Sequence, residues 1–173
     1  MLAVGIARSM EIGVFLLIFI MWGDGLASLG LARNQILPGL RRGLIWSAGF
    51  GCIVCLAGVV LYLFGKNPFK MLNGSLPEQQ LFFLLLLRCV IGPVAEEIFF
   101  RGILFGFLRR GGVFIAIFLS SLLFLLAHRQ AAGFPQMVGG ILFAVSYEVE
   151  GKLMTPITIH VLGNMAIFVV SVL

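Results

Sequence analysis

Residues 92–102 read GPVAEEIFFRG and place two adjacent glutamates and an arginine in a stretch that is otherwise apolar. Ionised side chains at membrane depth are costly, so a chain that keeps them usually has a use for them. On a helix, Glu97 and Arg101 share a face because they are four residues apart, which favours an ion pair. Glu96 points about 100° away from Glu97, which leaves it free to face a cavity and act as a general base. The alternative is that the charges only fix the packing of helices.

The composition predicts a membrane protein made of helices. Of the 173 residues, 61% are hydrophobic and only 11% are charged, too few to cover a soluble globule. We therefore expect one all-α domain over residues 1–173, a polytopic transmembrane helix bundle whose partner is the lipid bilayer. The net charge of +5 lies mostly in short loops, which indicates cytoplasmic connections and not nucleic-acid binding. No phosphate-binding glycine-rich loop is present either.

The apolar runs predict about six spans. They are expected at residues 10–31, 44–64, 78–108, 113–128 and 136–147, and from after Pro156 to 173. Pro38 should keep residues 32–43 a non-helical loop. Residues 65–80 should form a second loop, and Gly92-Pro93 should kink the third span and free backbone carbonyls there. If positive loops lie inside, residues 32–43, 109–112 and 148–155 are cytoplasmic and both termini lie outside.

Several other residues have both a functional and a structural interpretation. Asp24 is a second acid in an apolar run, either a helper at the site or a residue at the headgroup level. Arg88 either supports Glu96 or extends its charged end to an interface. Cys52 and Cys55 have redox or metal spacing but no charged neighbour that would activate a thiolate, so we interpret them as small packing residues.

Two later helices carry polar side chains that could reach the same site. His128 ends the fourth span, where a cation also caps a helix favourably. His160 and Asn164 are four residues apart on the sixth span, so they face the same way. They could act together as hydrogen-bond donors, or they could simply join neighbouring helices.

Taken together and in this order, the motifs resemble those of the CAAX protease and bacteriocin-processing family of glutamate-type intramembrane endopeptidases. The resemblance covers roughly residues 81–164, and rests on Glu96-Glu97-x-x-x-Arg101, Phe124-x-x-x-His128 and His160-x-x-x-Asn164. It implies that Glu96 and His128 activate a water, that Glu97 and Arg101 hold this arrangement, and that His160 and Asn164 form an oxyanion hole. It also implies a protein or peptide substrate with a transmembrane or lipidated tail, cut near its end. The small six-span size favours a processing enzyme of a bacterial or archaeal cell membrane.

Alternatives to this chemistry remain open. No serine or cysteine lies beside a histidine as a nucleophile, so hydrolysis by water is expected. Two histidines and two glutamates could bind zinc, but the histidines lie on separate helices and no His-Glu-x-x-His is present. We expect no metal and no other cofactor. A non-catalytic immunity or scaffold protein could use the same cavity.

The expected positions of Glu96 and His160 along the membrane normal do not match. His160 follows the turn before the sixth span so closely that it should lie shallower than Glu96. Either the fifth span is short and tilted, or residues 148–156 enter the bilayer where protein or a water-filled cavity covers them.

Overall fold

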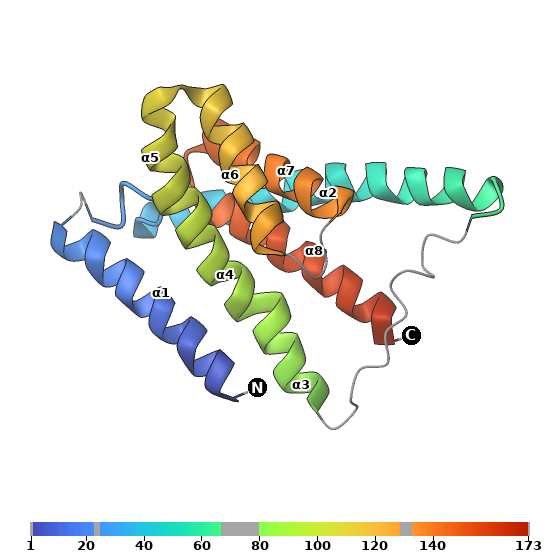
Figure 1. Cartoon of the computed structure of the whole chain (residues 1–173), viewed down its shortest axis with the longest axis horizontal. Coiled ribbons are helices and arrows are strands. Elements are labelled where there is room, and N and C mark those ends of the chain that lie inside the picture. Colours follow the sequence, from blue (N-terminus) through green and yellow to red (C-terminus); the bar gives the residue numbers. More distant parts are fainter. Residues whose placement is uncertain (1, 23–24, 67–79, 129–132, 173) are drawn as a thin grey trace.

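The computed structural model describes residues 2–22, 25–66, 80–128 and 133–172, and within these ranges the chain forms helices and no strand (Figure 1). The elements are α1 (Leu2–Trp22), α2 (Arg33–Leu63), α3 (Leu81–Leu85), η3 (Leu86–Ile91), α4 (Gly92–Glu97), η4 (Ile98–Phe105), α5 (Gly106–Leu108), η5 (Arg109–Gly111), α6 (Val113–Ala127), α7 (Phe134–Glu150) and α8 (Met154–Val172). Among the described residues, α1, α2 and α8 are long and apolar enough to cross a membrane, and α6 is a shorter apolar helix. The predicted all-α membrane helix bundle is confirmed.

The first two helices begin earlier than expected. α1 begins at Leu2 and ends at Trp22, and residues 26–30 form turns where the sequence predicted the end of a span. The predicted loop over residues 32–43 is wrong, because α2 begins at Arg33 and contains Pro38. A proline this close to a helix start removes one backbone hydrogen bond. The packing of the following turns against α8 offsets that loss.

Glycines allow the start of α2 to lie directly against α8. A Cβ atom at Gly43 would lie 2.5 Å from the Cβ of Thr158, and one at Gly39 would lie 2.8 Å from the Cβ of Met154. The Thr155 hydroxyl donates a hydrogen bond of 3.1 Å to the Gly39 carbonyl. Close backbone approach of this kind is how small residues hold helices together in membranes.

The rest of α2 extends away from the other helices (Figure 1). Cys52 and Cys55 lie on this part and are exposed. The packing role expected of these cysteines is therefore not seen within the described part of the chain.

The third predicted span is a continuous helical run from Leu81 to Leu108, with π-helical stretches on both sides of α4. Helix continues through Gly92-Pro93, and Pro93 lies in the first turn of α4. In the π-helical register, the Gly92 N–H donates to the Leu87 carbonyl, five residues back. The next donor in this register would be Pro93, which has no N–H, so the Arg88 carbonyl lacks a donor from its own helix. This carbonyl lies two turns before the paired glutamates.

The last three helices match the expected order but not every boundary. α6 ends at Ala127 and α8 begins at Met154, close to their predicted positions. α7 continues to Glu150, so Glu148 and Glu150 are helical and the expected polar turn shortens to residues 151–153. The helix ends there because Gly151 adopts a left-handed φ of 60°.

Glu150 joins the end of α7 to α2, in the polar connection outside the apolar spans. Its carboxylate Oε1 lies 2.8 Å from Arg42 Nε and 3.1 Å from Trp46 Nε1, and its side chain is 7% exposed. Burial alone would raise the pKa of Glu150, but the Trp46 and Arg42 hydrogen bonds and the nearby cations outweigh it and lower the pKa below its ordinary 4.5. The carboxylate is therefore charged at neutral pH.

The connection between α7 and α8 is covered by protein only at its end, where Leu153 is buried, whereas Gly151 is exposed and Lys152 is half-buried. The Leu153 N–H donates to the Leu29 carbonyl at 3.2 Å, and Leu153 packs in a core cluster with Leu29, Ile98 and Ile157. Gly30, at a φ of 73°, lies so close to Gly151 that a Cβ atom would overlap its carbonyl. Protein thus covers the residue that leads into α8, and the entry of residues 148–156 into the bilayer stays a prediction.

Candidate active site

Three side chains from three helices meet at one carboxylate oxygen. Glu96 lies on α4, His128 directly follows α6, and His160 lies on the second turn of α8. The Glu96 Oε2 atom is 3.5 Å from His128 Nε2 and 3.9 Å from His160 Nε2. The Glu96 side chain is 18% exposed, so the cluster is shielded without being closed. The sequence prediction that these three residues share a site is consistent with this geometry.

The backbone orients the ring of His128. Its Nδ1 atom lies 2.8 Å from the Phe124 carbonyl oxygen, which can only accept a hydrogen bond, so Nδ1 carries the proton. In the neutral ring, Nε2 is then an acceptor facing Glu96. His128 also terminates α6, with its main-chain N–H bonded to Leu125. His128 therefore ends the helix α6 and also faces Glu96, so the structural and the functional interpretations of this residue are compatible.

Glu97 forms a second, fully buried centre behind the first. Glu97 and Arg101 are both 0% exposed, with Arg101 Nε 3.2 Å from Glu97 Oε2 and Nη1 3.3 Å from Oε1. The predicted ion pair is present, although only the Nη1 contact has good hydrogen-bond geometry. Glu97 Oε1 also lies 2.8 Å from His160 Nδ1. Local spacing could not show this last contact, which joins residues far apart in the sequence.

Arg101 is held by contacts that the sequence analysis missed. Its Nη2 donates to the Gly140 carbonyl at 2.9 Å, and its guanidinium carbon lies 4.9 Å from the Phe124 ring centre and 5.2 Å from that of Phe143. A Cβ atom at Gly140 would lie 3.1 Å from the Cα of Ser121, so the missing side chain lets α7 approach α6. The Gly139-Gly140 pair in an apolar helix was the available signal for this close approach.

Asn164 lies one turn beyond His160 but makes a different contact. Its Nδ2 donates a hydrogen bond of 2.9 Å to the Arg88 carbonyl, the one left without a helical donor by Pro93. One amide hydrogen and the side-chain oxygen of Asn164 remain for other partners. The Arg88 side chain itself is exposed. Asp24 lies outside the described residues.

Comparison with known proteins connects this arrangement to one family. A family model described as type II CAAX prenyl endopeptidase, Rce1-like, matches residues 78–166, which contain every site residue described above. The chain belongs to this Rce1-like family. The membrane-embedded CAAX protease MroQ of Staphylococcus aureus (strain USA300) is 39% identical over 83 residues, which cover 43% of this chain and 34% of that protein. The matched part thus spans about a third of that relative. No solved structure gives a significant match.

Within the described residues of this Rce1-like protein, no three or more His, Cys, Asp or Glu side chains are grouped in a way that could hold a metal ion. A chelator experiment distinguishes hydrolysis that depends on zinc from hydrolysis without a metal.

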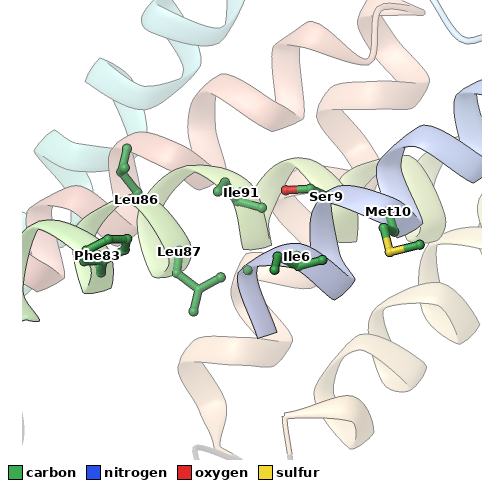
Figure 2. A pocket seen from close by; sticks show the side chains of 8 residues that line it. Ile6, Ser9, Met10, Phe83, Leu86, Leu87 and Ile91 are labelled. Carbon is green, nitrogen blue, oxygen red and sulfur yellow. The ribbon is translucent and has the colours of Figure 1, made fainter. Parts of the chain in front are cut away.

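An apolar groove lies beside the site helix in this Rce1-like fold. It has a volume of about 430 Å³ and separates the first half of α1 from α3 and η3 (Figure 2). Its lining consists of Gly5, Ile6, Ser9, Met10, Phe83, Leu86, Leu87 and Ile91. Ile91, one of its lining residues, precedes Glu96 by five residues on the same helical run.

Proposed function

We propose that this protein is a glutamate-type intramembrane endopeptidase, in which Glu96 and His128 activate a water that attacks a peptide carbonyl. One observation carries the proposal. A partly shielded carboxylate faces two imidazole nitrogens from separate helices, and the backbone fixes the ring of one of them. A structural ion pair would not need this second set of polar groups around Glu96.

The geometry suits activation of water. Glu96 Oε2 and neutral His128 Nε2 are both acceptors, and they are closer together than two hydrogen bonds of about 2.8 Å laid end to end. One water can therefore donate a hydrogen bond to each and direct a lone pair at the substrate. Glu96 takes the proton as the water attacks, and the leaving amine needs that same proton. The proposal includes no covalent enzyme intermediate.

His160 can stabilise the negative oxygen of the tetrahedral intermediate. Because its Nδ1–H donates to the Glu97 carboxylate, Nε2 becomes a donor only when the ring carries both protons. The Glu97 carboxylate lies against this ring and has Arg101 as its counter-charge, so its negative charge can stabilise that imidazolium. The four charges of the site then cancel. The negative charges of Glu96 and Glu97 balance the positive charges of Arg101 and a cationic His160. A preorganised oxyanion donor contributes roughly 3 kcal/mol.

Asn164 is proposed as the second oxyanion donor, through the amide hydrogen not used by the Arg88 carbonyl. That contact fixes the Asn164 amide group relative to the helix that carries Glu96. A fixed donor costs no reorganisation when charge develops, which is what an oxyanion hole requires.

The proposed substrate is a protein or peptide held at the membrane by a transmembrane segment or a lipid group and cut near its end. The family description names CAAX prenyl endopeptidases, and MroQ is named a CAAX protease. The helices suited to spanning a membrane agree with a substrate that reaches the site from the bilayer.

The test compares peptide termini by mass spectrometry in membranes from cells that carry wild type, Glu96→Gln or Glu148→Gln, each with and without a chelator. Glu148 is a matched control, because its carboxylate pairs with Arg109 at the surface and not at the site. We expect processing that Glu96→Gln abolishes and that Glu148→Gln and the chelator leave unchanged.

The other outcomes assign different functions. Processing that the chelator removes would show a metal-dependent protease. A Glu96→Gln protein that leaves all termini unchanged and still complements a deletion would show a binding or immunity protein without peptidase activity.

A further inference from the structure

Two cations are held on the last residue of α7, Glu150. Its carboxylate lies 2.8 Å from Arg42 Nε of α2, and its main-chain carbonyl accepts a hydrogen bond of 2.9 Å from Lys152 Nζ. Lys152 also lies against α2, because its Cβ is 3.3 Å from the place that a Cβ atom at Gly39 would occupy. Gly39 precedes Arg42 by one helical turn. Glu150 thus fixes an arginine and a lysine beside the same stretch of α2.

These two cations keep hydrogen-bond donors for a further partner. Arg42 contacts Glu150 through Nε, so within the described part of the chain its two terminal nitrogens are left for another acceptor, and its side chain is 51% exposed. Lys152 uses one of its three N–H groups on the Glu150 carbonyl. The Glu150 side chain is itself only 7% exposed. The two cations exceed this carboxylate by one charge, and the exposed Arg41 adds a second, so the surface attracts an anion.

Exposed apolar side chains begin directly beside these cations. Leu44 and Ile45 are 49% and 61% exposed, and Ile45 lies one turn beyond Arg42 on the same face of α2. Further along, α2 extends away from the other helices and exposes many large apolar side chains (Figure 1). Trp46 donates to Glu150 at 3.1 Å between the two regions, and tryptophan is enriched at the boundary of a membrane. This surface therefore fits a ligand that joins an anionic group to hydrocarbon chains.

We propose that Arg42 and Lys152 bind the phosphate of an anionic phospholipid whose acyl chains lie along the exposed apolar part of α2. The fork of an arginine matches two phosphate oxygens, and the lysine adds a point charge. Basic sites between membrane helices bind anionic headgroups in this way. A free phosphate would satisfy the cations but leave the neighbouring apolar side chains uncovered. The bound headgroup joins α2 to the connection that leads into α8, the helix that carries His160. The proposal does not depend on peptidase activity.

The experiment measures which lipids lie next to Trp46. Trp22→Phe leaves Trp46 as the single tryptophan of the chain. Purified full-length protein in this background is placed in vesicles of phosphatidylcholine and phosphatidylglycerol, with bromine on the acyl chains of one lipid or of the other. Bromine quenches tryptophan fluorescence at short range, so the two quenching curves give the local preference for phosphatidylglycerol. The preference is a ratio within one protein, so a lower yield of folded protein does not change it.

Arg110→Gln is the matched control for Arg42→Gln and Lys152→Gln. It removes the same charge from an exposed residue of η5, whose neighbour Arg109 pairs with Glu148 in the last turns of α7. Glu148 and Glu150 are two residues apart on α7, so they point about 200° away from each other. A cation near Glu148 therefore faces a different side of α7 from the proposed lipid site.

The Trp22→Phe protein should prefer phosphatidylglycerol beside Trp46 by on the order of 5- to 30-fold, because a basic residue near an anionic headgroup contributes about fivefold. Arg42→Gln and Lys152→Gln should each lower this preference by about fivefold, and Arg110→Gln should leave it unchanged. No preference before substitution, or an equal loss in Arg110→Gln, would overturn the proposal. A preference abolished by inorganic phosphate but not by sodium chloride at the same ionic strength would assign the site to free phosphate and overturn its role in lipid binding. Should Arg42→Gln fail to fold, Lys152→Gln decides.

Discussion

The buried Glu97–Arg101 pair allows stability and catalysis to be separated by one set of variants. Arg101→Met removes the counter-charge of a carboxylate that is 0% exposed, and it also removes the donor to the Gly140 carbonyl. Breaking one side of a buried ion pair costs about 3–5 kcal/mol, whereas the Gly140 carbonyl keeps its backbone donor within the helix α7. Since proteins unfold with only about 5–15 kcal/mol, we expect Arg101→Met to be severely destabilised.

The double variant Glu97→Gln/Arg101→Met should recover much of that stability. It leaves no unpaired charge, the glutamine oxygen can still accept from His160, and the methionine can pack against the Phe124 and Phe143 rings. We expect it to be more stable than Arg101→Met by about 3 kcal/mol, measured by unfolding in mixed micelles with tryptophan fluorescence. A double variant as unstable as Arg101→Met would refute the claim that an uncompensated charge is the cause.

Activity should not recover with stability. Without the Glu97 charge, His160 loses the group that stabilises its doubly protonated form, so the folded double variant should lack peptidase activity. Wild-type activity in that variant would refute the electrostatic role given to Glu97. Glu148→Gln/Arg109→Met removes a more exposed ion pair and serves as a control that should change neither property much.

Three further variants test separate parts of the structure. Gly140→Ala should lower the free energy of unfolding by about 1–3 kcal/mol through overpacking, and it should also lower kcat because it moves the carbonyl that holds Arg101; unchanged kcat would contradict this. Pro93→Ala returns an N–H to the helix, and this N–H competes with the Asn164 amide for the Arg88 carbonyl. We therefore expect kcat to fall by up to about 100-fold while the free energy of unfolding is unchanged or raised. Stabilisation by Glu150 is fully present above pH 4.5 and is lost as the pH falls through its lowered pKa. Glu150→Gln should therefore unfold with a weaker acid dependence than wild type, as followed by micelle unfolding at several pH values.

Helical periodicity was sufficient for contacts made within one helix. It gave the Glu97–Arg101 pair, because a four-residue spacing on a helix brings side chains together whatever the tertiary fold. It could not give the contact between Glu97 and His160, which depends on how α8 crosses the site helix. It also could not give the partner of Asn164, which follows from a π-helical register that the sequence does not show directly.

Local rules failed at Pro38 for a related reason. The proline rule describes the cost of one lost hydrogen bond, and that cost is real. Gly39 and Gly43 immediately after it allow α2 to lie against α8, and this packing involves residues more than a hundred positions later. The small residues were visible in the sequence, but their partner helix was not. Tertiary packing therefore decided the state of residues 33–43.

Because the two glutamates are adjacent in the sequence, one helix provides two carboxylates that differ in their exposure. Neighbouring residues on a helix diverge by about 100°, so Glu97 turns into the fully buried layer with Arg101 while Glu96 remains 18% exposed. The ring of His160 bridges the two, with Nδ1 at Glu97 and Nε2 facing Glu96. Any shift of His160 toward one carboxylate therefore moves it away from the other. The spacing of the acids thus limits where this ring can lie, and the proposed oxyanion donor is positioned by the same helix that carries the base.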